Sequence, residues 1–353
     1  MTSSETTVVD GPMASLALRA RSAELQAAEP RLRIRDRALR LGVSEAELVA
    51  AGAGVEAVAL SGTPQALVGD LGALGRVMAL SRNDWCVHER HGRYEDIQAD
   101  GRVGLVLGPD IDLRLFFDGW ARAWEVTENG RRSLQFFDRE GVAVHKVYRT
   151  DETDAAAWDA YIARHAAPAD APFVPQAIAV PAEAERVADP AALRARWLAL
   201  QDTHEFHPML RGFKIKRIAA LHAAGDDLAQ DVGIGAAEAM LTAAAASGQP
   251  IMCFLHNRGI VQIHTGPVHK LVRTGRWFNV LDASFNLHLD TDAITSCWVV
   301  CKPTSDGWVT SLEVYGPDDV LIVQFFGERK PGKPELTAWR ELLRGLCARP
   351  IAP

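Results

Sequence analysis

The sequence predicts an α+β protein built as a tandem structural duplication. The first observation is an internal repeat, because Asn83 matches Asn257 and Trp124 matches Trp298 at the same separation of 174 positions. The second is that each copy contains short alternating strands joined by turn sequences and flanked by helical segments. Strands connected by short hairpins pair antiparallel, so each half is expected to hold an antiparallel sheet with flanking helices.

Length and composition fit two globular halves. The chain has 353 residues, of which 48% are hydrophobic and 24% charged. These values exclude a disordered, collagenous or disulfide-scaffold protein. The formal charge is −7, with 38 basic and 45 acidic residues, so no overall field attracts a nucleic acid and we expect no nucleic-acid partner.

The sequence also indicates a cellular location. The first residues, MTSSETTVVDG, contain neither a basic nor an apolar signal region. The longest uncharged stretch, 239–255, is interrupted by Gly248 and Pro250, so we expect no insertion into a membrane. Five cysteines form no CxxC pair, which is typical of reduced thiols. A cytoplasmic protein is therefore predicted.

The repeat changes register once. Ser133 matches Ser311 at a separation of 178, so the second copy has gained four residues. We expect this gain in a loop, 302–307, that replaces the short hairpin turn at 128–130. The predicted organisation is an N-terminal segment, a first half, a Pro/Ala-rich linker and a second half, at residues 1–30, 31–165, 166–190 and 191–349.

Residues 33–50 predict two short helices. Gly42 is suited to end the first, and Ser44 with Glu47 forms a capping box for the second. The pattern is similar to a helix-turn-helix, and five arginines surround it: Arg31, Arg33, Arg35, Arg37 and Arg40. A DNA-reading second helix would be basic, yet this one carries acidic residues, so packing or a partner contact is favoured.

Two histidines are candidate metal ligands. His204 and His207 are three residues apart and would share a helix face, which suits a zinc pair or alternative ligands to one iron. Pro208 disfavours helical geometry at His207 and indicates a break there. From spacing alone, two surface histidines near a helix end are the more common arrangement, and no third ligand is nearby in the sequence.

Several cations are further candidates. Arg114 lies in an apolar strand, on the face opposite Leu113 and Leu115, where it is either a solvated residue or a charge beside an apolar ligand. Three more cations are scattered through the second half: Arg217, Lys302 and Arg329. Each alone is an ordinary surface residue. Together with an axial histidine they suit a planar, dianionic and mostly apolar ligand, as haem is.

These residues occur with a series of longer motifs: Ile34-Arg-Asp36, Leu41-Gly-Val-Ser-Glu-Ala-Glu-Leu48, Asp112-Leu-Arg-Leu115, Gln135-Phe-Phe-Asp138, Lys146-Val-Tyr148, Asn257-Arg-Gly259, Val261-Gln-Ile263 and Lys302-Pro-Thr-Ser-Asp-Gly307. The combination resembles the bacterial haemin transport or haemin-degrading family of HemS, HmuS, ChuS and PhuS. The resemblance runs from about Arg31 to Leu346. It implies paired halves, each with a large antiparallel sheet, that bind the cofactor haem in the cytoplasm.

The resemblance also implies roles for single residues. His204 takes the place of the iron ligand, and Arg114 that of the arginine on the distal side of the haem. Arg217, Lys302 and Arg329 take the places of propionate or pocket contacts. A further pocket position typically holds tyrosine, whereas this chain has Phe326, so one polar contact is expected to be lost.

The copies look chemically unequal. The counterpart of Arg114 is His288, and nothing in the first copy matches His204, so one haem per chain is expected. Some relatives carry a second histidine where this chain has His207, and they shift haem between the two histidines. His207 is therefore a possible alternative iron ligand.

Three functions are open. The first is oxidative degradation of haem for iron utilisation, with Arg114 as the catalytic residue and electrons from an external donor. The second is a non-catalytic haem carrier that delivers haem to a separate haem oxygenase. The residues named above do not separate these two functions. An inner-membrane haem importer is a further candidate partner. The third is a zinc or adaptor protein that uses the arginine-rich first helix.

Overall fold

The computed structural model describes residues 11–168, 172–330 and 332–353. The chain forms two compact units. Unit 1 comprises Met1–Leu80, His91–Ala179 and Arg258–Ile260, and unit 2 comprises Ser81–Arg90, Val180–Asn257 and Val261–Pro353. Each repeat thus contributes one short segment to the other unit. Residues 1–10 of the predicted N-terminal segment and 169–171 of the predicted linker lie outside the described residues.

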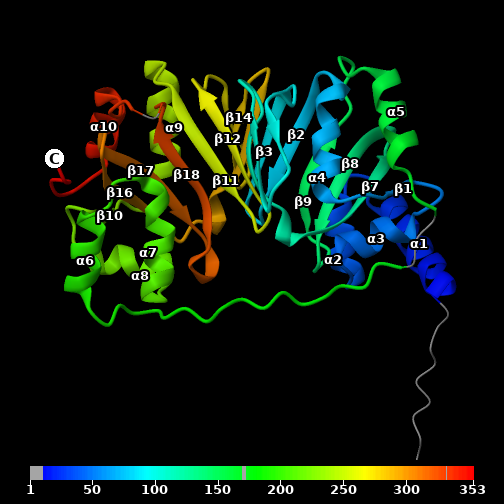
Figure 1. The fold of residues 1–353 in the computed structure, drawn as a ribbon, viewed down its shortest axis with the longest axis horizontal. Coiled ribbons are helices and arrows are strands. Elements are labelled where there is room, and N and C mark those ends of the chain that lie inside the picture. Colours follow the sequence, from blue (N-terminus) through cyan, green and yellow to red (C-terminus); the bar gives the residue numbers. More distant parts are fainter. Residues whose placement is uncertain (1–10, 169–171, 331) are drawn as a thin grey trace, which may run out of the picture. The chain divides into compact units, whose positions relative to one another are not determined.

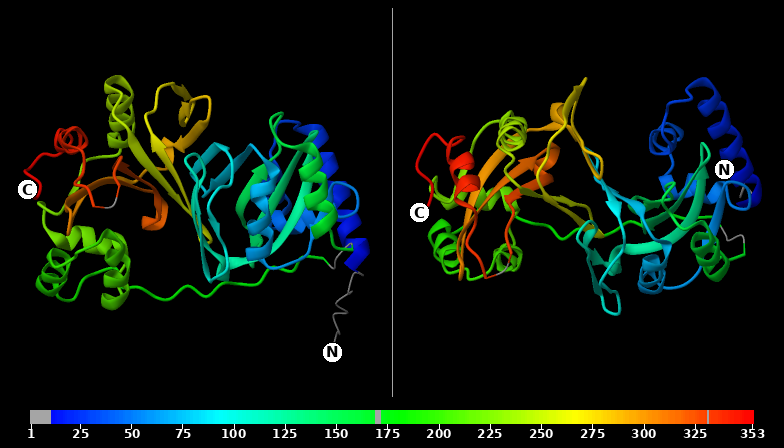
Figure 2. Two further views of the ribbon diagram at one scale, coloured as in Figure 1. Left: turned by 45° about the horizontal axis from the view of Figure 1, so that its top comes forward. Right: turned by 90° about the horizontal axis from the view of Figure 1, so that it is seen from above.

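Unit 1 contains a twisted antiparallel sheet in the order β1-β7-β8-β9-β2 and a smaller meander β4-β5-β6. Its strands are β1 (Ala57–Leu60), β2 (Val77–Arg82), β4 (Ile97–Gln98), β5 (Val103–Leu107), β6 (Asp112–Phe116), β7 (Trp120–Glu128), β8 (Arg131–Asp138) and β9 (Ala143–Tyr148). Its helices are α1 (Gly11–Ala28), α2 (Ile34–Leu41), α3 (Glu45–Ala51), α4 (Pro64–Gly69), η1 (Asp70–Leu74), η2 (Phe117–Gly119) and α5 (Ala155–His165). The dark blue helices α1–α3 lie together (Figure 1 and Figure 2).

Unit 2 contains an antiparallel sheet in the order β10-β16-β17-β18-β11-β12 and a second one in the order β3-β15-β14-β13. Its strands are β3 (Cys86–Gly92), β10 (Ala229–Asp231), β11 (Ile251–His256), β12 (Ile260–Gly266), β13 (Leu271–Thr274), β14 (Trp277–Leu281), β15 (Phe285–Asp290), β16 (Ser296–Thr304), β17 (Gly307–Tyr315) and β18 (Leu321–Gly327). Its helices are α6 (Pro190–Leu198), η3 (Thr203–Glu205), α7 (Phe206–Phe213), α8 (Arg217–Ala224), α9 (Ala236–Ser247), η4 (Thr291–Ala293), η5 (Pro317–Asp319) and α10 (Thr337–Arg344).

Both units cover their large sheets in the same way. In unit 1, α2 and α3 pack on one face of the sheet, and α4 and α5 pack on the other. In unit 2, α6, α7 and α8 cover one face, while α9 and α10 cover the opposite face. The predicted α+β class and tandem duplication are therefore confirmed.

The predicted N-terminal elements are also confirmed. Helix α2 ends at Leu41, and the capping residue Gly42 has a φ of 72°, in the left-handed region that glycine adopts without strain. Both hydrogen bonds of the capping box between Ser44 and Glu47 are present at the start of α3. The short hairpin turn predicted at 128–130 is present between β7 and β8, where Asn129 and Gly130 have the positive φ values, 51° and 75°, that a two-residue turn requires.

The predicted loop at 302–307 is wrong. Strand β16 continues to Thr304, and β17 begins at Gly307. Lys302 pairs with Val309 inside the ladder, and the turn consists of two residues. Because Trp124 pairs with Gln135 and Trp298 with Glu313, the four added residues lengthen each strand of the second hairpin by two positions. Residues 302–304 therefore pair as a strand, although the composition of 302–307 is typical of a loop.

Equivalent tryptophans fix the last helix of each copy. Trp158 of α5 and Trp339 of α10 are both fully buried. The indole of Trp158 donates to Glu125 at 2.9 Å, and that of Trp339 donates to the Thr310 carbonyl at 2.9 Å. Each helix is thereby bound to a strand through both packing and a hydrogen bond.

Replacing Trp339 by alanine is expected to destabilise unit 2 by about 3–5 kcal/mol, because the change leaves a large cavity and an unpaired carbonyl. Urea unfolding followed by circular dichroism measures the effect. Leu336, which is 39% exposed just before α10, provides the matched control. Leu336→Ala is expected to cost less than about 1 kcal/mol. Equal losses in the two variants would contradict the anchoring role of Trp339.

Candidate functional site

His204 lies on the surface of unit 2 with one ring nitrogen already bound. Asp202 caps the short helix η3 by accepting a hydrogen bond from the His204 amide at 2.8 Å. The same carboxylate oxygen lies 2.6 Å from Nδ1 of His204. The hydrogen bonds from the His204 backbone and ring lower the pKa of Asp202. A carboxylate at Nδ1 places the ring proton on that nitrogen. The lone pair of Nε2 is then available to bind a metal.

His204 is also accessible, since its side chain is 92% exposed. A ligand therefore reaches Nε2 without displacing protein atoms. Asp202 was not among the residues predicted from the sequence. Its position two residues before His204, as a helix-capping aspartate, is the signal that identifies it.

His207 lies in the first turn of α7, and Pro208 follows it within the same helix. Proline is tolerated there because amides of the first turn have no partner within the helix. The break predicted at His207 lies before that residue instead: the 3-10 helix η3 ends at Glu205, and the α-helix α7 begins at Phe206. Loss of solvation and the charges of Arg211 and Arg217 lower the pKa of His207, which favours the neutral imidazole that metals bind.

Two predicted cations share one buried carboxylate. The side chain of Glu313 is fully buried. Arg217 contacts it through Nε at 2.7 Å and Nη2 at 2.5 Å, and Nζ of Lys302 lies 2.9 Å away. The Tyr315 hydroxyl donates to it at 2.7 Å. Both cations lie 4.7 Å from the ring centre of Phe206.

The ionisation of this cluster follows from its charges. Burial alone would raise the pKa of Glu313, but Arg217 and Lys302 hold it well below its usual range. Burial lowers the pKa of Lys302, and the charge of Glu313 opposes that shift. Burial and the Glu313 carboxylate raise the pKa of Tyr315 well above its usual range, so Tyr315 stays a hydrogen-bond donor.

Arg329 differs from the other two cations. Its guanidinium lies 3.5 Å from Asp306, and its side chain is 18% exposed. Its Nε is buried without a hydrogen-bond partner among the described residues. Because a buried unpaired donor costs free energy, this nitrogen favours an acceptor that a ligand would supply.

Phe326 belongs to an aromatic patch that sequence analysis largely missed. Its ring packs edge-on against Phe254 at 5.0 Å, and the ring of His256 stacks on Phe254 at 6.5 Å. Strand pairing places Gln324 beside both Phe254 and Glu313, so the patch and the buried carboxylate lie on one sheet face.

His256 is the polar member of this patch. Burial and the charge of Arg217 lower its pKa to about 4, so its ring is neutral at neutral pH. Its Nε2 has no hydrogen-bond partner among the described side chains. The alternation of Met252, Phe254 and His256 along β11 is the sequence signal that places them on one face.

Arg114 belongs to unit 1. The predicted alternation is confirmed, because Leu113 and Leu115 are fully buried, whereas the Arg114 side chain is 33% exposed. Its Nη1 donates to Asp112 and to the Leu113 carbonyl. Leu105 lies directly opposite on β5. Arg114 is thus a surface charge that borders an apolar side chain.

The corresponding face of unit 1 carries different charges. At the repeat separation of 178, Glu313 corresponds to Gln135 and Gln324 corresponds to Lys146. Lys146 is buried and pairs at 2.5 Å with Glu45 of α3. In unit 1 the strand supplies the cation and a helix the anion, whereas in unit 2 the strands supply both Glu313 and Lys302, so the copies are chemically unequal at this face.

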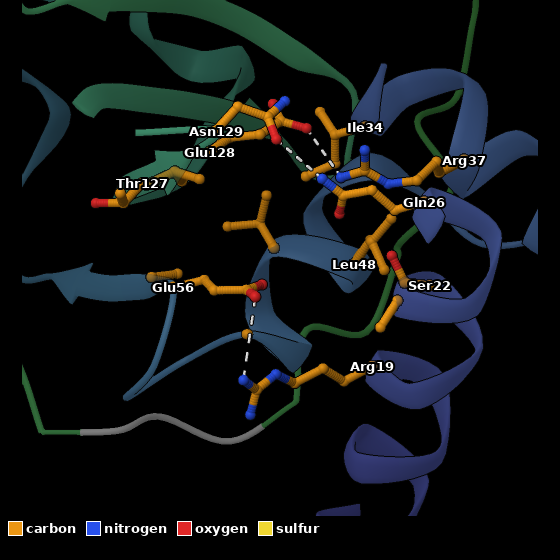
Figure 3. Close-up of a pocket in the computed structure, with 15 residues that line it drawn as sticks. Arg19, Ser22, Gln26, Ile34, Arg37, Leu48, Glu56, Thr127, Glu128 and Asn129 are labelled. Carbon is orange, nitrogen blue, oxygen red and sulfur yellow. Dashed lines mark hydrogen bonds and ion pairs between the residues drawn. The ribbon is translucent and has the colours of Figure 1, made fainter. Parts of the chain in front are cut away.

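A small pocket of about 140 Å³ lies elsewhere in unit 1, between α1, α2 and the β7–β8 turn (Figure 3). Arg37 donates to Glu128 at 2.8 Å, and Gln26 donates to Asn129 at 3.0 Å. The Arg37 side chain is only 5% exposed. This arginine of the first predicted helix therefore serves packing. None of the predicted site residues lines the pocket.

Over residues 11–168, 172–330 and 332–353, no group of three or more His, Cys, Asp or Glu residues is arranged to hold a metal ion. Within the same ranges, no helix is both long enough and apolar enough to cross a membrane.

A family model described as the haemin-degrading HemS.ChuX domain matches residues 42–165 and 214–346. The chain belongs to this haemin-degrading family. The two matched segments correspond to the two copies of the repeat. The predicted family membership is confirmed, and the matched segments include Arg114, Arg217 and Lys302 but not His204 or His207.

Three similar proteins cover nearly the whole chain. The hemin transport protein HmuS of Yersinia pestis is 39% identical over 93% of this chain and 97% of its own length. Holo-PhuS, a heme-binding protein from Pseudomonas aeruginosa, is 47% identical, with a TM-score of 0.90 over 93% of this chain and 97% of its own. The Escherichia coli O157:H7 heme-degrading enzyme ChuS is 35% identical, with a TM-score of 0.89 over 96% and 100% of the two chains.

Proposed function

We propose that this protein binds one haem in unit 2 through the His204 imidazole and degrades it oxidatively to release iron. The observation that carries the proposal is the hydrogen bond between Asp202 and Nδ1 of His204, which leaves an exposed Nε2 ready to bind iron. Family membership and the heme-binding and heme-degrading relatives support the choice of haem.

The residues of unit 2 fit this ligand. Phe254 and Phe326 offer a half-buried aromatic surface to the apolar porphyrin, whose burial contributes about 25 cal/mol per Å². The unpaired Nε of Arg329 is suited to a propionate carboxylate. Phe326 keeps the aromatic contact that tyrosine would make but has no hydroxyl to donate.

Arg114 of unit 1 is proposed as the catalytic residue that would assist the oxidation of bound haem. The resemblance to the family supports this role, and so does the position of Arg114 beside an apolar side chain on an exposed strand face. Bound haem supplies the redox-active iron, with electrons from an external donor. Arg114 supplies fixed positive charge and hydrogen bonds, and its ion pair with Asp112 holds the guanidinium in place.

A haem carrier is the second candidate, and His207 favours it. This histidine follows His204 by three residues and has a lowered pKa, so it offers a second neutral imidazole. Two neighbouring ligands allow haem to move between them during transfer to a separate haem oxygenase. A zinc or adaptor role is the third hypothesis, and it would gain support if zinc copurified and haem binding were intact without His204.

The deciding experiment is the visible spectrum of the haem-loaded protein during reduction by ascorbate in air, with catalase present to remove free peroxide. Decay of the Soret band with growth of a linear tetrapyrrole band is expected for the degrading enzyme. A Soret band that persists would support the carrier. A protein that forms no Soret complex would contradict both haem proposals.

Replacing Arg114 by alanine is expected to slow ring opening at least about tenfold, because hydrogen bonds and charge at the reacting side are lost. Haem affinity is expected to change less than about threefold, since His204 and the cations of unit 2 remain. The rate of Soret decay and a haem titration measure the two effects. Arg102, an 85% exposed arginine of unit 1 paired with Asp118, provides the control. Equal rates in Arg114→Ala and Arg102→Ala would contradict the catalytic role.

A further inference from the structure

We propose that Glu313 is a positioning residue that weakens haem binding by competing with a haem propionate for Arg217 and Lys302. This inference rests on the proposed function, because it assigns a role to the cations beside the haem-binding surface. It adds an internal competitor that promotes haem release.

Glu313 forms hydrogen bonds with both cations. Its carboxylate receives two hydrogen bonds from Arg217 and one from Lys302. Tyr315 donates at 2.7 Å, and the Ser311 hydroxyl lies 3.2 Å away. A propionate that approaches these cations therefore meets donors already bound to another carboxylate.

The equivalent position of unit 1 holds no carboxylate. The counterpart of Glu313 in the first copy is Gln135, which occupies the equivalent buried place opposite Trp124. Gln135 donates to Ser133 at 3.0 Å, and Ser133 is the counterpart of Ser311. A neutral side chain of the same length thus packs at the equivalent place in the sheet of unit 1.

The charges of the cluster do not cancel. Two cations share one carboxylate, which leaves one positive charge in excess. Arg217 retains 22% exposure of its side chain, whereas Lys302 is 3% exposed and Glu313 is fully buried. An incoming carboxylate therefore contacts Arg217 first, with Lys302 contributing its charge from behind. Glu313 reduces the attraction that this carboxylate experiences.

Four proteins test the competition: the unchanged chain, Glu313→Gln, Lys302→Met and the double variant. Counted as formal charges, the cluster without the anion has an excess of two, the cluster without Lys302 has none, and the double variant has one, as in the unchanged chain. The rate of haem transfer to excess apomyoglobin is measured for each. We expect Glu313→Gln to release haem about tenfold more slowly than the unchanged chain, and Lys302→Met to release it about tenfold faster. The double variant is expected within about threefold of the unchanged chain.

If Glu313 only stabilises the fold, the order of the haem-release rates should differ, and the double variant should release haem fastest of the four proteins. Thermal unfolding monitored by circular dichroism establishes that each variant is folded. Should Glu313→Gln fail to fold, Glu313→Asp and the pair Lys302→Met and Lys302→Met/Glu313→Gln carry the test. The double variant must then release haem more slowly than Lys302→Met, and Glu313→Asp must stay close to the unchanged chain.

The iron complex of protoporphyrin dimethyl ester provides the ligand control. Its propionates carry no charge, so the order among the variants should disappear. An order that persists with the ester would overturn the proposal, as would haem release from folded Glu313→Gln at or above the rate of the unchanged chain. Failure of the haem function itself is distinguishable, because the unchanged chain would then show no Soret complex.

Discussion

Replacing His204 by alanine is expected to lower haem affinity at least about tenfold, which corresponds to about 1.4 kcal/mol or more of binding free energy. The variant loses the imidazole whose Nδ1 is bound to Asp202 and whose Nε2 is exposed. Porphyrin packing and the propionate contacts remain, so binding should weaken without disappearing. A haem titration followed at the Soret band measures the affinity, and the band position reports the change of iron ligand.

Two further variants test which histidine binds the iron, and a third tests the carboxylate that supports His204. His207→Ala should leave the Soret position unchanged if His204 binds the iron. His269→Ala, which changes an exposed histidine of the same unit, should leave both the affinity and the spectrum unchanged. A normal spectrum in His204→Ala together with a shifted one in His207→Ala would transfer the ligand role to His207. Asp202→Asn tests the supporting carboxylate, and we expect about a tenfold loss of affinity from misorientation of the ring.

The features predicted correctly from the sequence are those that depend on short-range patterns. A capping box, a left-handed glycine and a two-residue turn are each determined within a few positions, and Ser44, Gly42 and Asn129 adopt the expected geometry. The alternation around Arg114 has the same origin, because successive side chains of a strand point to opposite faces. The duplication is visible because two such patterns recur in register.

The features missed from the sequence depend on pairing between distant segments. Glu313 is one of many acidic residues until the ladder and α8 bring it to Lys302 and Arg217. The alternation along β11 places His256 beside Phe254, but nothing local to the sequence shows that its Nε2 is buried without a partner among the described residues. The predicted loop at 302–307 shows the same limit, since turn-forming residues there are overridden by cross-strand pairing.

The exchange of segments between the units could not be predicted from the sequence either. Ser81–Arg90 comes from the first copy but belongs to unit 2, and Arg258–Ile260 comes from the second copy but belongs to unit 1. Because the copies are similar, a strand of either copy has the residue pattern needed to fit the other. A repeat identifies equivalent segments without showing which copy each one joins.

Acidification is expected to destabilise both units steeply, because each contains a buried neutral histidine. Burial lowers the pKa of His145 in unit 1 to about 3 and that of His264 in unit 2 to about 3. Between about pH 6.5 and that value, the unfolded chain binds a proton at each site and the folded chain does not. The stability that these neutral histidines contribute is therefore fully present above about pH 6.5 and is lost as the pH falls. Each histidine contributes a slope of about 1.4 kcal/mol per pH unit.

Urea unfolding at pH 7, 6 and 5, followed by tryptophan fluorescence, measures this slope. His264→Gln removes one of these titrating groups and should reduce the slope by about 1.4 kcal/mol per pH unit, while His145 and His256 still contribute. The same change removes the stacking of His264 on Phe285 at 3.7 Å, so stability at neutral pH should also fall. His269→Gln alters an exposed histidine and provides the control for the slope. Because packing and titration act separately, a loss of stability with an unchanged slope would show that His264 is protonated in the folded protein.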